Sequence, residues 1–234
     1  MQIQKRRKVK APPTSTVRAD SSQDPRRLFL VADIGGTNAR FAFAEPGNPI
    51  PQPIASYAVE NFPSFEEVLD RLERDWVALG QPNTRLERVC LAVAAIPEQR
   101  EISFTNNAWR FSADGVAARL SCPDISIIND FAAVARALPA LESKHLESIG
   151  GGSVEAQKPM VAIGPGTGTG VASLVFDSAG APIVLAGEGG HVDFAPITDM
   201  EFEVLKRLRA RFGRVSIERL LCGAGIVNIY QALA

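Results

Sequence analysis

The sequence lacks several features that would assign it to a specialised class. No apolar stretch approaches the roughly 20 residues that a bilayer-spanning helix needs. The three cysteines are odd in number, widely spaced and form no C-x-x-C pair. A disulfide framework, a cysteine zinc cluster and a membrane-spanning protein are therefore not expected. A reducing cytoplasm is the compartment that fits these absences.

A large excess of charge is also missing, since the formal net charge is −1. Residues 1–27 nevertheless carry eight Lys or Arg against two Asp, which leaves +6 there and −7 in the rest. The run Lys5–Lys8 offers a site for nucleic acid or a targeting address, but its surroundings are rich in Pro, Ser and Gln. We expect residues 1–27 to be a disordered basic tail and do not expect a nucleic-acid partner.

The remaining sequence predicts an α/β protein. With 46% apolar and 22% charged residues, 234 residues suffice for one large domain or two small ones. Alternation of strands and helices implies parallel pairing through crossovers. Three glycines at 150–152 close a loop and suggest domains at 28–140 and 141–234. The patterns predict strands at 28–32, 41–44, 88–96, 102–104, 125–128, 160–163, 171–176 and 183–186, and helices at 64–79, 111–120, 131–138, 199–212, 216–221 and 224–234.

The first glycine-rich turn follows the predicted strand Leu28–Ala32, which places Asp33 at the strand's carboxyl end. Gly35 and Gly36 permit a tight turn whose backbone N–H groups can face an anion. Magnesium between Asp33 and a phosphate would explain the neighbouring carboxylate. A plain Gly-Gly hairpin explains the same residues, because the apolar pattern resumes at Phe41–Ala44.

A second glycine-rich segment, Gly164–Gly170, lies between two predicted strands. It offers backbone N–H groups and two hydroxyls to a phosphate. It matches neither the P-loop, since no Lys follows, nor the dinucleotide fingerprint, since a strand comes next. Alone it is a weak signal, but two such hairpins, each opening one α/β half, are far more specific.

Other polar residues sit where predicted elements begin or end. Asn129 and Asp130 end a buried strand, where ligands of open α/β sheets bind, although Asp130 could also be only a helix N-cap. Glu188 and His191 are spaced to hydrogen-bond one small polar ligand such as a polyol. They could also begin a metal site, but no second nearby His or Cys completes it. Glu218 reads as a first-turn acid that favours a helix dipole.

Taken in order, these motifs resemble the bacterial glucokinases of the hexokinase class, in the actin-like ATPase and sugar kinase superfamily. The resemblance runs from about residue 28 onward. It implies an α/β, two-lobed actin-like ATPase or ribonuclease H-like fold, with mixed sheets flanked by helices and an incomplete second lobe. The matching segments are Asp33–Phe41, Thr105–Ser112, Ile128–Phe131, Gly164–Ala172, Gly187–Pro196 and Val215–Arg219.

The resemblance also implies an activity, namely transfer of the ATP γ-phosphate to the 6-hydroxyl of glucose. Asp130 would be the catalytic base and Asp33 the metal ligand, with ATP and Mg²⁺ as cofactors and a homodimer as the assembly. The sugar ligands would be Asn106, Asn129, Asp130, Glu188, His191 and Glu218. The nucleotide-binding residues would be Ala32, Asp33, Ile34, Gly35, Gly36, Thr37, Gly166, Thr167 and Gly168.

Two departures from the family keep other hypotheses open. Family members continue with an adenosine site and further helices that nothing after Ala234 supplies, and Ala94–Pro97 differs from the family's sugar-side loop. A fragment of a full enzyme, a truncated product and a non-catalytic glucose-binding or regulatory protein remain alternatives. So does another hexose kinase. The related repressor and sugar kinase group is disfavoured because no cysteine lies between Cys122 and Cys222.

Overall fold

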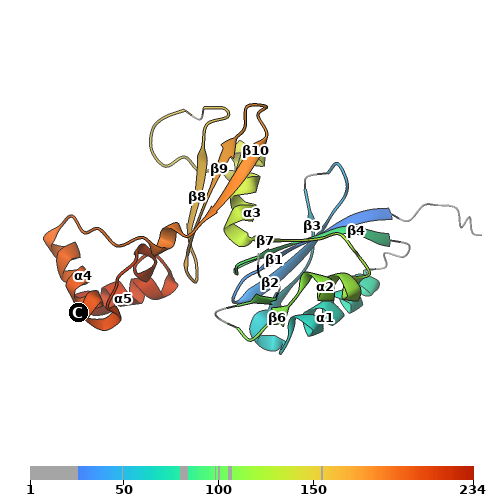
Figure 1. Cartoon of the computed structure of the whole chain (residues 1–234), viewed down its shortest axis with the longest axis horizontal. Coiled ribbons are helices and arrows are strands. Elements are labelled where there is room, and N and C mark those ends of the chain that lie inside the picture. Colours follow the sequence, from blue (N-terminus) through green and yellow to red (C-terminus); the bar gives the residue numbers. More distant parts are fainter. Residues whose placement is uncertain are drawn as a thin grey trace, which may run out of the picture.

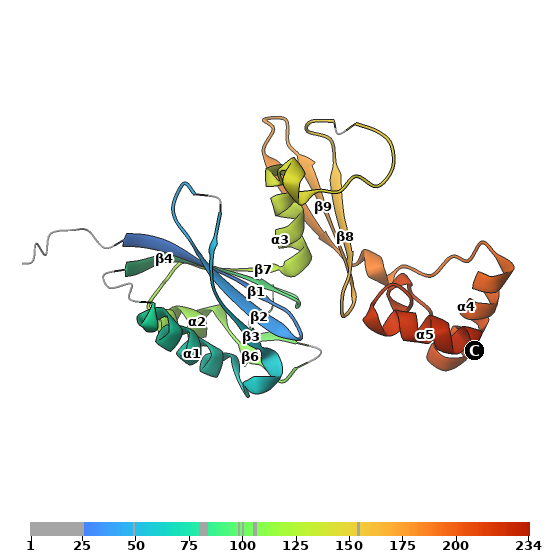
Figure 2. The same cartoon turned by 180° about the vertical axis from the view of Figure 1, so that it is seen from behind.

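The structure, a computed structural model, describes residues 26–48, 50–79, 84–97, 99, 101–104, 107–153 and 155–234. Within them the chain builds a five-stranded sheet, a three-stranded sheet and a two-stranded pair. Figures 1 and 2 show the three-stranded sheet rising between the larger sheet and a helical unit at the C-terminal end. The α/β class expected from the sequence is confirmed.

The five-stranded sheet is mixed, in the order β3-β2-β1-β4-β7. Strands β1 and β2 form an antiparallel hairpin. Strands β1, β4 and β7 run parallel to one another, as the crossover pattern predicted. Its elements, with the two helices that cover it, are β1 (Arg26–Ile34), β2 (Asn38–Ala44), β3 (Gln52–Ala58), β4 (Thr84–Val93), β7 (Ile125–Asn129), α1 (Phe65–Ala78) and α2 (Ala113–Leu120).

The core of this unit follows from period-two and period-3.6 patterns. Every second residue of β1 from Leu28 to Ile34 is buried, and so are Phe65, Val68 and Leu72 on one face of α1. These residues belong to one apolar cluster. Ser64 caps α1, because its hydroxyl accepts the Glu67 N–H at 3.3 Å, as the sequence predicted. One stripe of a helix therefore closes one face of the sheet.

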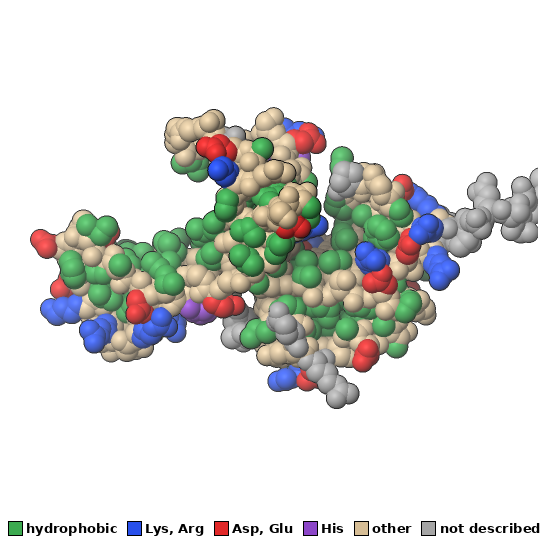
Figure 3. Space-filling model, turned by 45° about the horizontal axis from the view of Figure 1, so that its top comes forward, with side chains coloured by type: hydrophobic (Ala, Val, Ile, Leu, Met, Phe, Trp, Pro, Cys, Tyr) green, Lys and Arg blue, Asp and Glu red, His purple; other side chains and the backbone are tan. Residues whose placement is uncertain are grey.

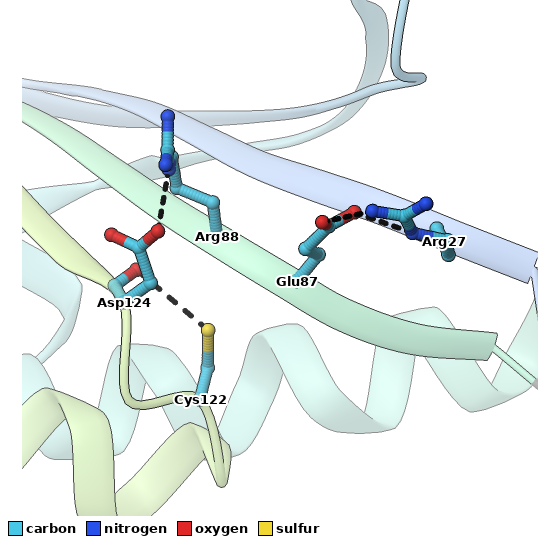
Figure 4. A network of polar contacts seen from close by, with 5 residues as sticks. All are labelled: Arg27, Glu87, Arg88, Cys122 and Asp124. Atoms are coloured by element: carbon cyan, nitrogen blue, oxygen red, sulfur yellow. Dashed lines mark hydrogen bonds and ion pairs between the residues drawn. The ribbon is translucent and has the colours of Figure 1, made fainter.

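Ion pairs join the strands of this sheet at the end farthest from the β1–β2 turn (Figure 4). The Arg27 guanidinium binds the Glu87 carboxylate and holds the pKa of that carboxyl below its usual range. Arg88 Nε donates to Asp124 Oδ2 at 2.7 Å. Exposed pairs of this kind contribute little stability. The strand β1 begins at Arg26, so the last two residues of the expected tail belong to the sheet. Residues 1–25 lie outside the described part.

The three-stranded sheet consists of β8 (Met160–Pro165), β9 (Thr169–Phe176) and β10 (Pro182–Gly187), all antiparallel. One face is covered by α3 (Asp130–Ala137), whose Ala135 is fully buried with Leu174 and Ala172. The helix expected in the first domain therefore packs on the second sheet. The boundary expected at 140 and 141 does not follow this packing, because the chain passes to the second sheet directly after β7.

The other face of this sheet exposes apolar side chains in a cross-strand pattern. Val161, Ile163, Ile183 and Leu185 are each between 45% and 66% exposed. Figure 3 shows apolar side chains gathered over this part of the molecule and over the helical unit. The face is thus apolar although no described element covers it.

The C-terminal helical unit contains α4 (Asp199–Phe212) and α5 (Gly223–Leu233), with 3-10 turns η4 (Gly189–His191) and η5 (Ile217–Arg219). A capping box between Thr198 and Glu201 starts α4 and Gly213 ends it, so the predicted helix 199–212 is confirmed. Val204, Leu208, Val215, Leu220 and Ala232 form its small core. The helix expected at 216–221 is only the short turn η5.

Several short elements complete the described chain, and some expectations were wrong there. The sequence did not predict β3, and the start of the expected helix 111–120 belongs to a two-stranded pair. No helix among the described residues is long and apolar enough to cross a membrane. The remaining elements are η1 (Val59–Asn61), β5 (Ile102–Ser103), β6 (Arg110–Phe111), η2 (Leu138–Ala140) and η3 (Ser143–His145).

Candidate active site

Asn129 and Asp130 lie where β7 ends and α3 begins. The Asn129 side chain caps the helix, since its Oδ1 accepts the Ala132 N–H at 3.1 Å. The suggestion that Asp130 serves only as the N-cap is therefore wrong. Because Asn129 supplies the cap, the Asp130 carboxylate at the first helical position remains available for another role.

The Asp130 carboxylate is half-buried and accepts hydrogen bonds from both of its chain neighbours. Its Oδ1 accepts the Phe131 N–H at 2.8 Å and the Asn129 Nδ2 at 3.1 Å. Burial raises the pKa of the Asp130 carboxyl, the Phe131 N–H opposes the rise, and the negative charge of Asp33 adds to it. A carboxylate with a raised pKa is a stronger base than an ordinary one, which suits proton abstraction.

The first hairpin places Asp33 on β1 opposite Arg40 on β2. Arg40 Nη1 donates to Asp33 Oδ2 at 2.8 Å, and the Asp33 side chain is 53% exposed. The turn closes through a Gly35 N–H to Asn38 carbonyl bond of 2.9 Å. The hairpin interpretation of this segment is confirmed, whereas phosphate binding by the same turn stays a prediction.

The other residues of this turn that were predicted to bind the nucleotide differ in how exposed their side chains are. Ala32 and Ile34 are buried in the core, so only their backbone could approach a ligand. Thr37 is exposed, its carbonyl accepts the Val59 N–H at 2.9 Å, and its hydroxyl makes no hydrogen bond to another described residue. Gly36 belongs to the same turn between β1 and β2. The turn therefore presents backbone and one hydroxyl to the outside.

A magnesium site can be tested against the donors present. Among the described residues, no group of three or more His, Cys, Asp or Glu side chains is placed to hold a metal. Asp33 is a single exposed carboxylate whose one charged partner is Arg40. This arrangement fits an ion that keeps its waters and is carried by substrate phosphates, and it does not fit a protein cage.

The second hairpin has its tip at Gly166, Thr167 and Gly168, between β8 and β9. Its Gly166 N–H donates to the Gly168 carbonyl at 2.7 Å. Thr169, just beyond the tip, is buried; its N–H donates to Glu218 Oε2 at 2.9 Å and its hydroxyl to the Leu221 carbonyl. Of the two hydroxyls expected to face a phosphate, only that of Thr167 is exposed.

Glycine is required on the strands of this hairpin because an aromatic ring lies on them. Gly164 and Gly170 are cross-strand partners. A Cβ on Gly170 would lie 1.8 Å from Phe131 Cδ2, and one on Gly164 would lie 2.7 Å from Phe131 Cζ. The residue that follows Asp130 therefore rests directly on the second hairpin, which fixes the start of α3 against it.

Glu188 and His191 flank the η4 turn that follows β10. The His191 Nε2 atom lies 3.6 Å from Glu188 Oε2. The His191 side chain is 56% exposed and the Glu188 side chain is 79% exposed. Arg214 Nη2 donates to the His191 carbonyl at 2.6 Å. A Cβ on Gly190 would lie 2.2 Å from the Thr169 carbonyl oxygen, so this turn is seated against the second hairpin.

Glu218 lies in η5, beside this turn. The Ile217 N–H donates to the Val192 carbonyl at 2.9 Å, and Asp193 and Ser216 form an antiparallel bridge. The structure therefore brings Glu218 next to the segment that carries His191. It also joins Glu218 to Thr169 through a hydrogen bond. Glu218 is therefore more than an acid that favours the dipole of a first helical turn.

Asn106, predicted to bind the sugar, lies outside the described residues. Its neighbour Asn107 accepts the Trp109 N–H at 2.9 Å through Oδ1, and its Nδ2 is buried without a partner among the described residues. The sequence did not point to Asn107, Phe131, Arg40 or Arg214, and it pointed to Thr169 only as a hydroxyl for phosphate. The two hairpin glycines Gly164 and Gly170 were the one signal that a bulky group packs there.

The predicted residues thus form two groups. Asn129, Asp130 and Asp33 belong to the first, which lies at the carboxyl ends of β1 and β7. Glu188, His191, Glu218 and the tip of the second hairpin form the other. Within the described part of the chain, no hydrogen bond or ion pair joins the groups directly, and Phe131 is the packing link between them.

An apolar cavity of about 270 Å³ lies in the helical unit between α4, η5 and α5. Its lining is apolar except for Glu201, so it does not suit a polyhydroxylated ligand. It is separate from the carboxylates described above, although Ile217 and Leu221 of its wall flank Glu218. The lining residues are Phe194, Met200, Glu201, Val204, Ile217, Leu220, Leu221, Ile229 and Leu233.

A mixed sheet opened by a glycine hairpin, a second sheet opened by another, and an acid at the passage between them agree with the actin-like ATPase fold that the family resemblance implied. The family model described as Glucokinase matches residues 30–234. The chain belongs to the glucokinase family.

Similar proteins agree with this assignment. The glucokinase of Marinobacter nauticus is 42% identical over 207 residues, which cover 88% of this chain and 62% of that protein. A crystal structure of glucokinase from an Antarctic psychrotroph matches with a TM-score of 0.72 and 33% identity, over 91% of this chain and 65% of that one. The glucokinase of Balamuthia mandrillaris, solved in complex with glucose, matches with a TM-score of 0.64 and 18% identity, over 88% and 62%. The chain spans about 62% of the length of the curated relatives it matches.

Proposed function

We propose that this chain supplies the sugar site and the phosphate hairpins of a glucokinase, which transfers the γ-phosphate of ATP to the 6-hydroxyl of glucose. The single observation that carries the proposal is the position of Asp130. It is a half-buried carboxyl with a raised pKa. Asp130 follows β7 directly and is the first residue of α3, the helix that rests on the second hairpin through Phe131. Because the chain belongs to the glucokinase family, glucose and ATP are the substrates that we propose.

Asp130 acts as the general base in this proposal. An alcohol is a poor nucleophile at neutral pH, so a positioned carboxylate that accepts the 6-hydroxyl proton contributes on the order of 10²- to 10⁴-fold. The Asn129 amide and the Phe131 N–H orient one carboxylate oxygen, which leaves Oδ2 to receive the proton. Glu188, His191, Glu218 and Asn129 bind the sugar hydroxyls through directional hydrogen bonds.

The two hairpins bind the nucleotide phosphates in this proposal. The N–H groups of Gly35 and Gly166 close the two turns, which leaves those of Gly36, Thr37, Thr167 and Gly168 for phosphate. The exposed hydroxyls of Thr37 and Thr167 are available beside them. Asp33 would hold Mg²⁺ through its waters, and the ion would neutralise the charge that develops during transfer. Arg40, bound to Asp33, would then have to share that carboxylate.

Two measurements on the 234-residue chain test the proposal. Calorimetry with glucose is expected to show saturable binding, and a coupled assay with ATP, Mg²⁺ and glucose is expected to show glucose 6-phosphate. Asp130→Asn keeps the size of the side chain and one acceptor oxygen, so it should bind glucose nearly as well as wild type. Turnover should fall at least 10²-fold, because the neutral amide cannot accept the proton.

Each other outcome has a definite meaning. Wild-type turnover by Asp130→Asn would contradict the role of this carboxylate. Glucose binding without any turnover by the wild-type chain would favour a sugar-binding protein over an enzyme. Tighter binding or faster turnover with mannose or glucosamine would assign another hexose. The homodimer that the family implies stays a prediction. So does the reducing cytoplasm that the number and spacing of the three cysteines suggested.

A further inference from the structure

One carboxylate connects the predicted sugar site with the second phosphate hairpin. Glu218 Oε2 accepts the Thr169 N–H at 2.9 Å, while Oε1 makes no hydrogen bond to another described residue. The same carboxylate lies against the hairpin tip, because a Cβ on Gly168 would be 2.5 Å from Oε2. Glu218 therefore touches both the residue and the glycine that end the predicted phosphate turn.

The segment around Glu218 holds the hairpin at two further points. The Thr169 hydroxyl donates to the Leu221 carbonyl, and the Gly223 N–H donates to the Gly166 carbonyl at 3.0 Å. These two bonds join backbone to a hydroxyl or to backbone, so they do not depend on any ligand. The Glu218 bond is different, because its acceptor is a side chain with a second oxygen that faces no described donor.

We propose that Glu218 is a positioning residue that links sugar occupancy to the order of the hairpin Gly166–Thr169. A sugar hydroxyl donates to Oε1 and fixes the carboxylate, and the fixed carboxylate holds the Thr169 N–H and hence the neighbouring N–H groups of Thr167 and Gly168. This proposal rests on the proposed function, since it takes a sugar as the ligand of Oε1. By linkage, the sugar and the ordered hairpin stabilise one another by the same factor.

Substitutions can break this contact from either side. Glu218→Ala removes the carboxylate from both hairpin and sugar. Gly168→Ala places a Cβ in the position of Oε2; the obstacle is the end of a flexible side chain, so the carboxylate moves away while remaining able to bind sugar. Gly166→Ala is the matched control in the same hairpin, because the nearest atom to its Cβ would be 4.0 Å away.

Hydrogen exchange of the Thr169 amide, followed by NMR, tests the anchor without any ligand. Glu218→Ala and Gly168→Ala should both exchange this amide at least about tenfold faster than wild type, because its acceptor is lost. Gly166→Ala should exchange it at the wild-type rate. Wild-type exchange in Glu218→Ala, or equal rates in Gly168→Ala and Gly166→Ala, would overturn the proposal.

The same amide reports the link to the sugar when glucose is added. In wild type, saturating glucose should slow exchange of the Thr169 amide by about fivefold to tenfold. In Gly168→Ala, glucose should still bind by calorimetry but should leave this exchange unchanged. A merely structural Glu218 would give no glucose dependence in either protein, and that result would overturn the link.

Failure of the proposed function is distinguishable from failure of the anchor. If the wild-type chain binds no glucose by calorimetry, the proposed function fails and the sugar link fails with it. The ligand-free exchange rates then still decide whether Glu218 anchors the hairpin.

Discussion

The two glycine hairpins look alike in sequence but are held in different ways. The β1–β2 turn is closed by a bond of its own, from the Gly35 N–H to the Asn38 carbonyl, and by one from the Val59 N–H, directly after β3, to the Thr37 carbonyl. The β8–β9 tip is held by distant segments, through Glu218, Leu221 and Gly223, and Phe131 rests on its strands. The first hairpin is thus a local structure and the second depends on long-range contacts.

This difference assigns separate roles to the two hairpins. The first brings Asp33 to the carboxyl end of β1, the central strand of a well-packed sheet. The core of this sheet contains none of the predicted sugar ligands. The second is the meeting point of α3, η4 and η5, which carry Asp130, His191 and Glu218. Changes in the second hairpin should therefore disturb the fold and the sugar site together, whereas changes in the first should remain local.

Glycine substitutions give the largest expected contrast. Gly170→Ala forces a Cβ into the Phe131 ring and should lower the free energy of unfolding by about 3 kcal/mol, as overpacking does. Gly35→Ala has its nearest neighbour, the Asn38 carbonyl oxygen, at 3.7 Å and should stay within about 1 kcal/mol of wild type. Urea denaturation of both variants measures the contrast. Equal losses would mean that the two hairpins are held alike.

Threonine substitutions give a smaller contrast. Thr169→Val removes the buried hydroxyl that donates to the Leu221 carbonyl, which should cost about 1 to 2 kcal/mol. Thr37→Val removes an exposed hydroxyl without a described partner and should change stability by less than about 0.5 kcal/mol. Thermal unfolding of the matched pair at one pH compares them. A loss at Thr37 as large as that at Thr169 would contradict the assignment.

The smallest expected effect is that of the Asp33 charge, in the first hairpin, on the pKa of Asp130. The Asp33 charge makes ionisation of Asp130 harder, so Asp33→Asn should lower the pKa of the Asp130 carboxyl toward its ordinary value. Carbon-detected NMR titration of the carboxyl signal measures the shift. Asp124→Asn, which removes a carboxylate from the opposite end of β7, is the control and should leave that pKa unchanged. A rise in Asp33→Asn would contradict the proximity of the two carboxylates.

The sequence predicted the local parts of this molecule well. The cap at Ser64, the span of α4 and the strands β1, β7 and β9 follow from short local patterns, and the family motifs led to Asp130. It failed where the outcome depends on distant partners. Strand β3 has Pro53 and a weak alternation, and it is a strand because β2 pairs with it.

The site shows the same limit. A composition-based boundary after α3 could not anticipate that Phe131 packs on Gly164 and Gly170, more than 30 residues away. The capping role of Asn129 and the bond between Glu218 and Thr169 also depend on side-chain geometry. The family resemblance identified Asn129 and Glu218, but only the folded arrangement shows which atoms meet.

The central claim is that η4 carries a sugar site, and the two histidines of this chain offer a matched comparison. His191 approaches Glu188 in that turn, whereas His145 ends the exposed turn η3 and its ring accepts the Glu142 N–H at 3.3 Å. Both can be replaced by alanine without disturbing a core. Their different surroundings should separate sugar binding from general effects of losing an imidazole.

Calorimetric titration of glucose into wild type, His191→Ala and His145→Ala is the most direct measurement. We expect saturable binding by wild type and by His145→Ala with equal affinity. His191→Ala should lose at least tenfold in affinity, equivalent to about 1.4 kcal/mol. Equal affinity in all three proteins, or no glucose binding by wild type, would contradict the central claim.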